Sequence, residues 1–335
     1  MALGLMLALT GCGAGGPDDA DQPVVAVPAP APEPAPVPPQ QRSQADIRQA
    51  RAEAARAANR AADATTASPA SAQLALYLAG VESDLLGRGK LRRDRAPADA
   101  TYDAEILARN FALIALRDEY GPGGLRHATD SQPAPLRRWS GPVRIQPEFG
   151  GSSDTGDRAR DRTTIAAVAA RIARASGHDV GLTASGGNFI VLTLTEDERR
   201  EIGPRLANLV PGIPASDITA IRDLARGNYC TVFAYSRGRD ASYTNAVALI
   251  RAELPPRLRA SCFEEELAQG MGLANDSPAV RPTVFNDDEE FALLTTHDEA
   301  LLAILYDPRL RPGMTESQAS PIIRTIAAEQ IGGDT

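Results

Sequence analysis

Three consecutive glutamates lie among apolar residues in the segment 262–276, which reads CFEEELAQGMGLAND. The spacing of the apolar residues predicts a helix over 262–273, with Leu267 and Met271 on its apolar face. Glu266 falls between that face and a neighbouring polar stripe. A carboxylate in such a position is costly unless it is hydrogen-bonded or paired with a charge. We therefore predict that Glu266 is either a structural acid or the acid–base group of a site.

The polar stripe has a regular spacing. Read from Glu265, the sequence is E-E-x-x-Q-x-x-G-x-x-N, formed by Glu265, Glu266, Gln269, Gly272 and Asn275. This pattern resembles the metzincin metallopeptidase motif H-E-x-x-H-x-x-G-x-x-H, in which histidines hold zinc and the glutamate is the general base. By that resemblance Glu266 keeps the position of the base and Gly272 that of the turn. The other three residues replace the histidines.

The residues at the histidine positions are poor ligands for zinc. Zinc favours imidazole nitrogen and thiolate sulfur, whereas Gln and Asn offer neutral, hard oxygen donors that suit calcium or magnesium better. Without zinc, no bound water has its pKa lowered to about 7, so the candidate base Glu266 has no activated water to deprotonate. We therefore predict a degenerate motif without a bound metal or cofactor, and we assign no catalytic residue.

Four further blocks of sequence carry a closer resemblance. They read LRRWSGPVRI, EEELAQGMGLANDSP, FNDDEEFALLTTHDE and LYDPRLRPGM. They resemble a bacterial family catalogued as domain of unknown function 2927, whose members are often described as candidate lipoproteins. The resemblance covers residues 136–330 and implies no reaction, substrate or cofactor. The segment 294–306 and the order of strands and helices before the motif are also similar to the metzincin fold.

No other group of residues has the spacing of a catalytic or metal site. His127, His178 and His297 are far apart in the sequence, and we expect structural or solvated side chains. Cys262 has no His/Asp set beside it that would make it a nucleophile. The acidic run 286–290 lacks the spacing and the glycine of an EF-hand, so a solvated loop is expected there.

Beyond Cys12, the cysteines are Cys230 and Cys262. An even number of remaining cysteines in an exported protein favours a disulfide. For a loop of this size, the chain-entropy model gives a stabilisation of roughly 3–4 kcal/mol. Two buried free thiols are the alternative.

The N-terminal segment 1–12 reads MALGLMLALTGC, a short apolar run. Its last four residues resemble the bacterial lipobox, in which the cysteine receives a lipid, although the positively charged start of a signal segment is missing. A chance cysteine is the alternative. The next stretch, 13–70, is predicted as a Pro/Ala-rich disordered linker. Within it, the Pro-Ala repeats of 17–40 favour a polyproline II spacer of about 3 Å per residue, and 43–66 could form a solvated helix. We therefore expect lipidation of Cys12, attachment to a membrane and a cell-envelope domain that faces the periplasm.

The coarse order of elements indicates an α/β (α+β) domain. Helices are predicted at 71–87 and 102–120, with Gly121-Pro122 as a stop, within a helical lead-in (71–135). The following domain reads strand, helix, strand, strand, helix, strand, strand, helix, which predicts a zincin-like mixed sheet with a backing helix and the motif helix. The predicted strands are 143–149, 180–184, 189–194, 230–236 and 246–254, and the helices are 159–176, 195–209 and 262–273. Capping boxes are predicted at Thr195-x-x-Glu198 and Thr296-x-x-Glu299.

The charge composition of the chain indicates which class of binding partner to expect. The chain of 335 residues has a net charge of −8, and we predict no basic face, so we expect no nucleic-acid partner. Two functions remain, beside a purely structural domain without a cleft function. One is an envelope protein whose degenerate cleft binds a peptide or an envelope protein through an edge strand. The other is a hydrolase that uses Glu265, Glu266, Gln269 and Asn275 in a non-standard way.

Overall fold

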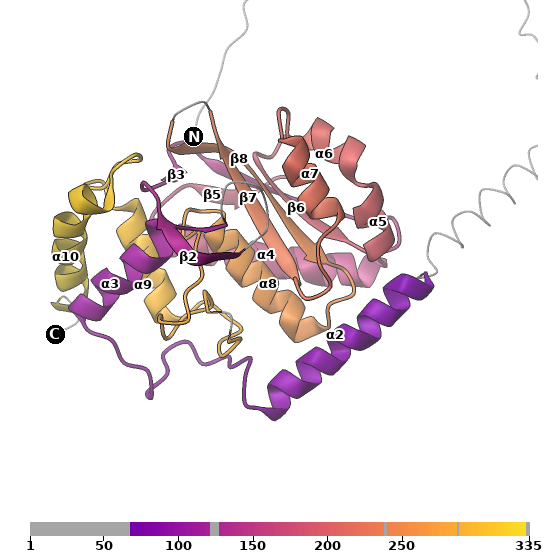
Figure 1. Cartoon of the computed structure of the whole chain (residues 1–335), viewed down its shortest axis with the longest axis horizontal. Helices are drawn as coiled ribbons and strands as arrows, with labels where there is room; N and C mark the ends of the chain where they lie inside the picture. Colours follow the sequence, from indigo (N-terminus) through magenta and orange to yellow (C-terminus); the bar gives the residue numbers. More distant parts are fainter. Residues whose placement is uncertain (1–67, 121–126, 238–239, 287, 333–335) are drawn as a thin grey trace, which may run out of the picture. The chain divides into compact units, whose positions relative to one another are not determined.

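The structure, a computed structural model, describes residues 68–120, 127–237, 240–286 and 288–332 (Figure 1). The predicted signal segment with Cys12, and almost all of the predicted linker (13–70), lie outside these ranges. None of the helices described is both long enough and apolar enough to cross a membrane.

Helices and strands alternate along most of the described chain. The helices are α2 (Pro69–Gly87), α3 (Ala104–Ala115), α4 (Thr155–Ser176), α5 (Glu196–Glu201), α6 (Gly203–Leu209), α7 (Ala215–Arg222), α8 (Pro256–Gln269), α9 (Thr296–Tyr306) and α10 (Glu316–Gly332). The strands are β1 (Arg117–Tyr120), β2 (His127–Pro133), β3 (Arg138–Trp139), β4 (Val143–Phe149), β5 (Val180–Leu182), β6 (Phe189–Leu194), β7 (Cys230–Ser236) and β8 (Ser242–Arg251).

The main sheet is mostly parallel. Its strand order is β3-β8-β6-β4-β5, and β7 pairs with β8 in the antiparallel direction. The same stretch of β8, Ala246–Ile250, pairs with both β6 and β7, so these two strands flank β8 on opposite edges. A mixed sheet with helices packed on it confirms the predicted α/β class. β1 and β2 form a separate two-stranded sheet.

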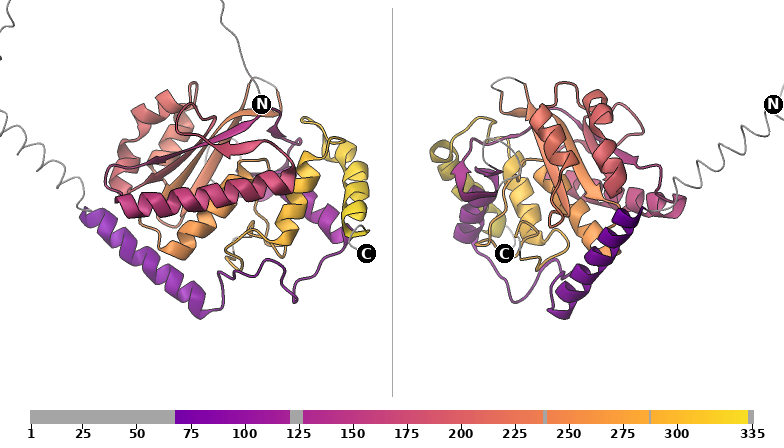
Figure 2. Two further views of the ribbon diagram at one scale, coloured as in Figure 1. Left: turned by 180° about the vertical axis from the view of Figure 1, so that it is seen from behind. Right: turned by 45° about the vertical axis from the view of Figure 1, so that its right-hand side comes forward.

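Helices cover both faces of the main sheet (Figures 1 and 2). One face, which holds Val191 and Ala248, packs against α4, α8 and α9 in the larger core. The other face, which holds Leu192 and Leu249, packs against α5, α6 and α7. Because both faces are covered, β6 is apolar at nearly every position instead of alternating with polar residues.

The N-terminus of α8 is capped by another helix. Its N-cap residue, Pro255, makes no side-chain capping bond. Instead the Glu82 carboxylate of α2 accepts hydrogen bonds from the backbone N–H groups of Arg257 (3.0 Å) and Leu258 (2.9 Å). A carboxylate at this end also interacts favourably with the helix dipole. The lead-in helix α2 therefore positions the motif helix.

The motif helix begins earlier and ends earlier than predicted. α8 starts at Pro256, which fits the first turn because proline has no N–H to leave unpaired, and it ends at Gln269. The predicted range 262–273 was therefore wrong at both ends. Cys262 lies in the middle of the helix, and Gly270–Gly272 form the turn after it.

Two other helix predictions were wrong in extent. The helix predicted over 102–120 ends at Ala115, because Arg117–Tyr120 instead pairs with β2, an interaction that local sequence does not reveal. The helix predicted over 195–209 is broken at Ile202 into α5 and α6.

Other boundaries agree with prediction only in part. β8 begins four residues before and ends three residues before the predicted 246–254, β5 ends at Leu182, and α4 begins at Thr155. The capping box at Thr195 is present, and β4, β6 and β7 have the predicted bounds. The box before α9 uses Thr295 and Asp298, one residue before the predicted pair.

Candidate functional site

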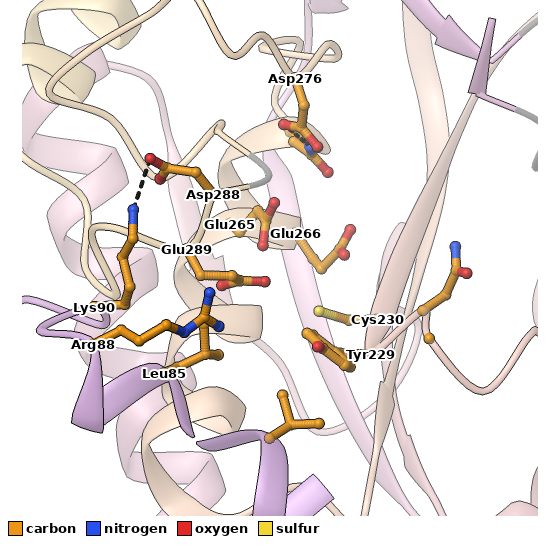
Figure 3. Close-up of a pocket in the computed structure, with 14 residues that line it drawn as sticks. Leu85, Arg88, Lys90, Tyr229, Cys230, Glu265, Glu266, Asp276, Asp288 and Glu289 are labelled. Carbon is orange, nitrogen blue, oxygen red and sulfur yellow. Dashed lines mark hydrogen bonds and ion pairs between the residues drawn. The ribbon is translucent and has the colours of Figure 1, made fainter. Parts of the chain in front are cut away.

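A pocket of about 470 Å³ lies between α8, the start of β7, the end of α2 and the loop before α9 (Figure 3). α8 contributes Glu265, Glu266 and Gln269 to its lining, and β7 contributes Cys230. The structure thus brings three of the five motif residues to one cavity. α2 contributes Leu85, which sequence reasoning did not connect with the motif.

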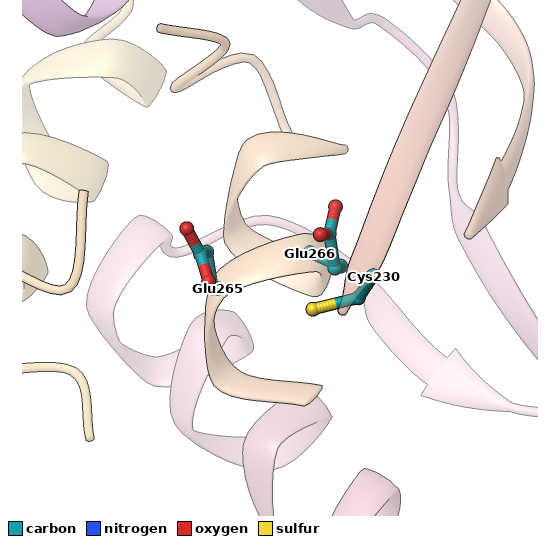
Figure 4. Close-up of side chains that lie close together, drawn as sticks. All are labelled: Cys230, Glu265 and Glu266. Carbon is teal, nitrogen blue, oxygen red and sulfur yellow. The ribbon is translucent and has the colours of Figure 1, made fainter. Parts of the chain in front are cut away.

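The two pocket glutamates differ in exposure. Glu266 is 4% exposed, whereas Glu265 is half-buried. Carboxylate oxygens of both residues and the sulfur of Cys230 lie within 4.8 Å of one another, and Figure 4 shows the helix and the strand that carry them. The side-chain amide of Gln269 donates a hydrogen bond to the Asp276 carboxylate at 2.9 Å. Asp276, which also lines the pocket, is a site residue that the motif did not identify.

Asn275 takes no part in this lining. It is 1% exposed, and its side-chain amide donates to the Leu113 carbonyl at 2.7 Å. Its backbone N–H donates to the Ile114 carbonyl at 3.0 Å. The residue at the third histidine position therefore ties the loop after α8 to α3.

Gly272 makes the turn that the motif spacing indicates. Its φ of +124° lies in the region that favours glycine, and a Cβ atom there would be 2.2 Å from the Arg137 carbonyl oxygen. The Trp139 indole donates to the Gly270 carbonyl (2.8 Å), and the Tyr306 hydroxyl donates to the Met271 carbonyl (3.0 Å). The carbonyls at the end of α8 thus have fixed partners.

Glu264, the first of the three consecutive glutamates, has a structural role. Its carboxylate forms an ion pair with the Arg171 guanidinium of α4 at 3.2 Å and accepts a hydrogen bond from Leu294 N–H at 3.3 Å. Burial raises the pKa of Glu264, and the positive charge of Arg171 opposes that rise. Of the three glutamates, one therefore joins helices, and two face the pocket.

The pocket lining carries more negative than positive charge. Its carboxylates belong to Glu265, Glu266, Asp276, Asp288 and Glu289, and its cations belong to Arg88 and Lys90. The Lys90 ammonium lies 2.9 Å from Asp288, as drawn in Figure 3. Acidic residues that the sequence assigned to a solvated loop therefore form one wall.

The neighbouring Glu290 has a different role. It pairs with Arg92 at 2.8 Å and with Arg281 at 2.6 Å. The acidic loop is thus fastened to the rest of the domain by ion pairs.

Cys230 and Cys262 form the predicted disulfide, with their Cα atoms 6.0 Å apart. It joins the first residue of β7 to the middle of α8. A disulfide sulfur is not a thiolate, so the group of Cys230, Glu265 and Glu266 offers only carboxylates as strong ligands. That donor set does not suit zinc.

A buried arginine shapes the pocket wall that precedes β7. Arg251 is 1% exposed and donates to the carbonyls of Leu224, Ala225 and Asn228. It also pairs with Glu196 at 2.7 Å. Asn228 lines the pocket, so this arginine, which lies on the far end of β8, fixes part of the site.

The two histidines whose side chains the structure describes, His178 and His297, do not line the pocket. His297 is fully buried, and its Nε2 atom is 3.0 Å from the Asn110 amide. The His178 Nε2 atom lies 2.8 Å from the Gly141 carbonyl. The side chain of His127 lies outside the described residues.

Another cavity, of about 170 Å³, lies farther along β7. Val232 and Ala234 of β7 and Tyr243 of β8 contribute to its lining, and Gln269 lines both cavities. Both cavities lie between β7 and the end of α8, and we call the two together the β7 cleft. The sequence predicted both β7 and α8, but no local pattern shows that the fold places this strand beside this helix.

Comparisons with known proteins give one match. The model of a family described as "Protein of unknown function (DUF2927)" matches residues 104–325. The matched region begins before the blocks in 136–330 and includes α3, β1 and β2. No curated protein and no solved structure matches the chain.

Proposed function

The chain belongs to the DUF2927 family, and from its geometry we propose that it binds an extended peptide segment in the β7 cleft, as a lipid-anchored protein of the cell envelope. The observation that carries this proposal is the position of β7. Among the residues that the structure describes, no strand pairs with its outer edge, and that edge borders the cleft.

Backbone hydrogen bonds identify the groups on this edge. Ala246 N–H donates to Asn188 on the β6 side, whereas Arg251 N–H donates to Tyr229 on the β7 side. Because alternate residues of a strand bond to opposite neighbours, Val247 and Leu249 bond to β7. Their partners are Phe233 and Thr231. The N–H and C=O groups of Cys230, Val232 and Ala234 therefore point outward.

These outward groups suit β-strand addition. In that mode, main-chain hydrogen bonds supply affinity and pockets for alternate side chains supply specificity. The β7 cleft offers both features, since cavities adjoin Cys230 at one end and Val232 with Ala234 at the other.

The hydrolase hypothesis finds less support. It needs Glu265, Glu266, Gln269 and Asn275 to face one cavity, and Asn275 is bonded to Leu113 instead. Gln269 is bonded to Asp276. The zincin-like relationship, with a degenerate motif that has become a binding cleft, is part of the proposal and rests on motif spacing and element order.

Binding is tested by blocking the edge. Val232→Pro removes an outward N–H and leaves the hydrogen bonds between β7 and β8 in place. An edge strand tolerates proline at such a position. The matched control is Val180→Pro on β5, the opposite edge strand. Val143 donates to Asp179 and Thr183 donates to Ile145, so the N–H of Val180 also points outward.

A random peptide library is selected on the immobilised full chain carrying Cys12→Ser. The proposal predicts peptides that bind this chain and the Val180→Pro variant but are lost with Val232→Pro. Thermal unfolding verifies that both variants fold. Peptides that bind all three chains equally would reject the proposal.

The anchor is tested separately in cells. The lipobox-like residues before Cys12 and the Pro/Ala-rich stretch after it support lipidation. The full-length protein should incorporate a labelled fatty acid and sediment with membranes, and Cys12→Ser should abolish both. A Cys12→Ser variant that still carries the label would reject lipidation at this residue.

A further inference from the structure

We propose that the bound segment carries a lysine or arginine whose side chain enters the larger, acidic cavity, and an apolar residue two or four positions away that enters the smaller cavity. This inference rests on the proposed function and specifies the class of segment that the β7 cleft selects.

The side chains of β7 alternate between the two faces of the main sheet. Cys230, Val232 and Ala234 of β7 pack with the α8 core, whereas Phe233 and Tyr235 pack with α5–α7. Residues directly opposite each other in neighbouring strands place their side chains on the same face of the sheet. A segment added to the outer edge therefore directs alternate side chains toward α8, where both cavities lie.

The larger cavity suits a long cationic side chain. Its lining combines an excess of carboxylates with apolar surface from Leu85 and Tyr229. Lysine and arginine pack their aliphatic stems on such surface while the charged group reaches polar partners. Lys90, which lines this cavity, already forms an ion pair with one of its carboxylates, that of Asp288. Charge complementarity therefore favours a basic residue opposite Cys230.

The smaller cavity suits an apolar side chain. Its charged lining residues, Asp118 and Arg137, pair with each other at 2.6 Å. Apart from Gln269, which it shares with the larger cavity, the rest of its lining consists of Val232, Phe233, Ala234, Tyr243 and Ala274. Since the charges compensate, the cavity has no excess charge to attract an ion, and burial of apolar area supplies the gain.

The spacing follows from β7 itself. Val232 is two residues from Cys230 and Ala234 is four, and all three point toward α8. Because strand residues on one face repeat with a period of two, the residues opposite them are separated in the same way. A basic residue opposite Cys230 thus lies two or four positions from the residue in the smaller cavity.

The test uses the peptides that bind the Cys12→Ser chain and are lost with Val232→Pro. Their sequences should be enriched in Lys or Arg, with an apolar residue two or four positions away. Replacing that Lys by Gln should weaken binding about tenfold or more, as expected for loss of one close charge pair. Glu265→Gln should weaken binding of the Lys peptide by a similar factor and leave the Gln peptide nearly unchanged.

The possible negative results of this test lead to different conclusions. If peptides are sensitive to Val232→Pro but lack basic residues, or if Glu265→Gln weakens Lys and Gln peptides equally, the inference is overturned and the proposed function stands. If no peptide is sensitive to Val232→Pro, both are overturned.

Discussion

The disulfide between Cys230 and Cys262 joins the first residue of β7 to the middle of α8, with 6.0 Å between the two Cα atoms. The bond therefore sets the distance between the two walls of the β7 cleft. It links an edge strand, which has a neighbour on only one side, to a helix that is mostly buried. The cleft owes part of its shape to this cross-link.

Removing the disulfide should lower stability substantially. The chain-entropy model gives roughly 3–4 kcal/mol for the 32-residue separation of Cys230 and Cys262. Urea denaturation of the double variant Cys230→Ala/Cys262→Ala should show this loss relative to the oxidised protein. A reducing agent should destabilise the original chain and leave the double variant unchanged. Equal stability of both oxidised proteins would contradict the prediction.

Gly272 should be far less replaceable than another glycine with positive φ. Gly272→Ala combines a strained backbone with overlap against Arg137 O, and should cost at least about 3 kcal/mol in free energy of unfolding. Gly186→Ala is the control, because its φ is +67° and nothing lies within 4 Å of the added Cβ. Its cost should be about 1 kcal/mol. Similar costs measured by chemical denaturation would show that the Arg137 contact is not limiting.

Loss of the Glu82 cap should weaken α8 although the change is made in α2. Glu82→Ala leaves two N–H groups of α8 without their carboxylate and should cost about 1–2 kcal/mol. Asp84→Ala in the same helix removes only an exposed pair with Arg88 and should cost less than about 0.5 kcal/mol. Thermal unfolding compares the two. A larger effect of Asp84→Ala would refute the capping role.

Glu196 should stabilise the fold in a pH-dependent way. Burial by itself would raise its pKa, but hydrogen bonds from Arg199, Arg200 and Arg251 lower the pKa from 4.5 to about 2. Since the folded-state pKa is depressed, this stabilisation is fully present above about 4.5 and is lost as the pH falls toward about 2.

The matching variant is Glu196→Gln. It leaves the buried guanidiniums of Arg199 and Arg251 without this counter-charge and should cost about 3–5 kcal/mol near neutral pH. The difference from the original chain should shrink as the pH falls below 4.5. Arg200→Ala, which removes a mostly exposed partner, should have little effect. A difference that is constant over this range would contradict the assignment.

Sequence periodicity predicted the elements well where apolar pattern and turn residues agree. β4, β6 and β7 were predicted to the residue, and Gly177 ends α4 with the expected left-handed conformation. The end of α3 was missed because a hairpin takes over the next residues, and pairing with a distant strand outweighs local preference.

The motif predicted the site only in part. Glu265, Glu266 and Gln269 share one side of α8, so their proximity follows from helical spacing. Asn275 lies beyond the end of α8, where helical spacing no longer applies and a contact with α3 decides its orientation. Asp276, Tyr229 and Leu85 reach the same pocket from other segments, and no local pattern connects them with the motif.

The most direct test of strand addition is amide hydrogen exchange resolved by residue, measured on the Cys12→Ser chain with and without a selected peptide. If the peptide adds to β7, the N–H groups of Val232 and Ala234 should become protected on binding. Those of Thr231 and Phe233, which already bond to β8, should change little. Binding that leaves Val232 and Ala234 exchanging as fast as before would contradict the claim that β7 receives the peptide.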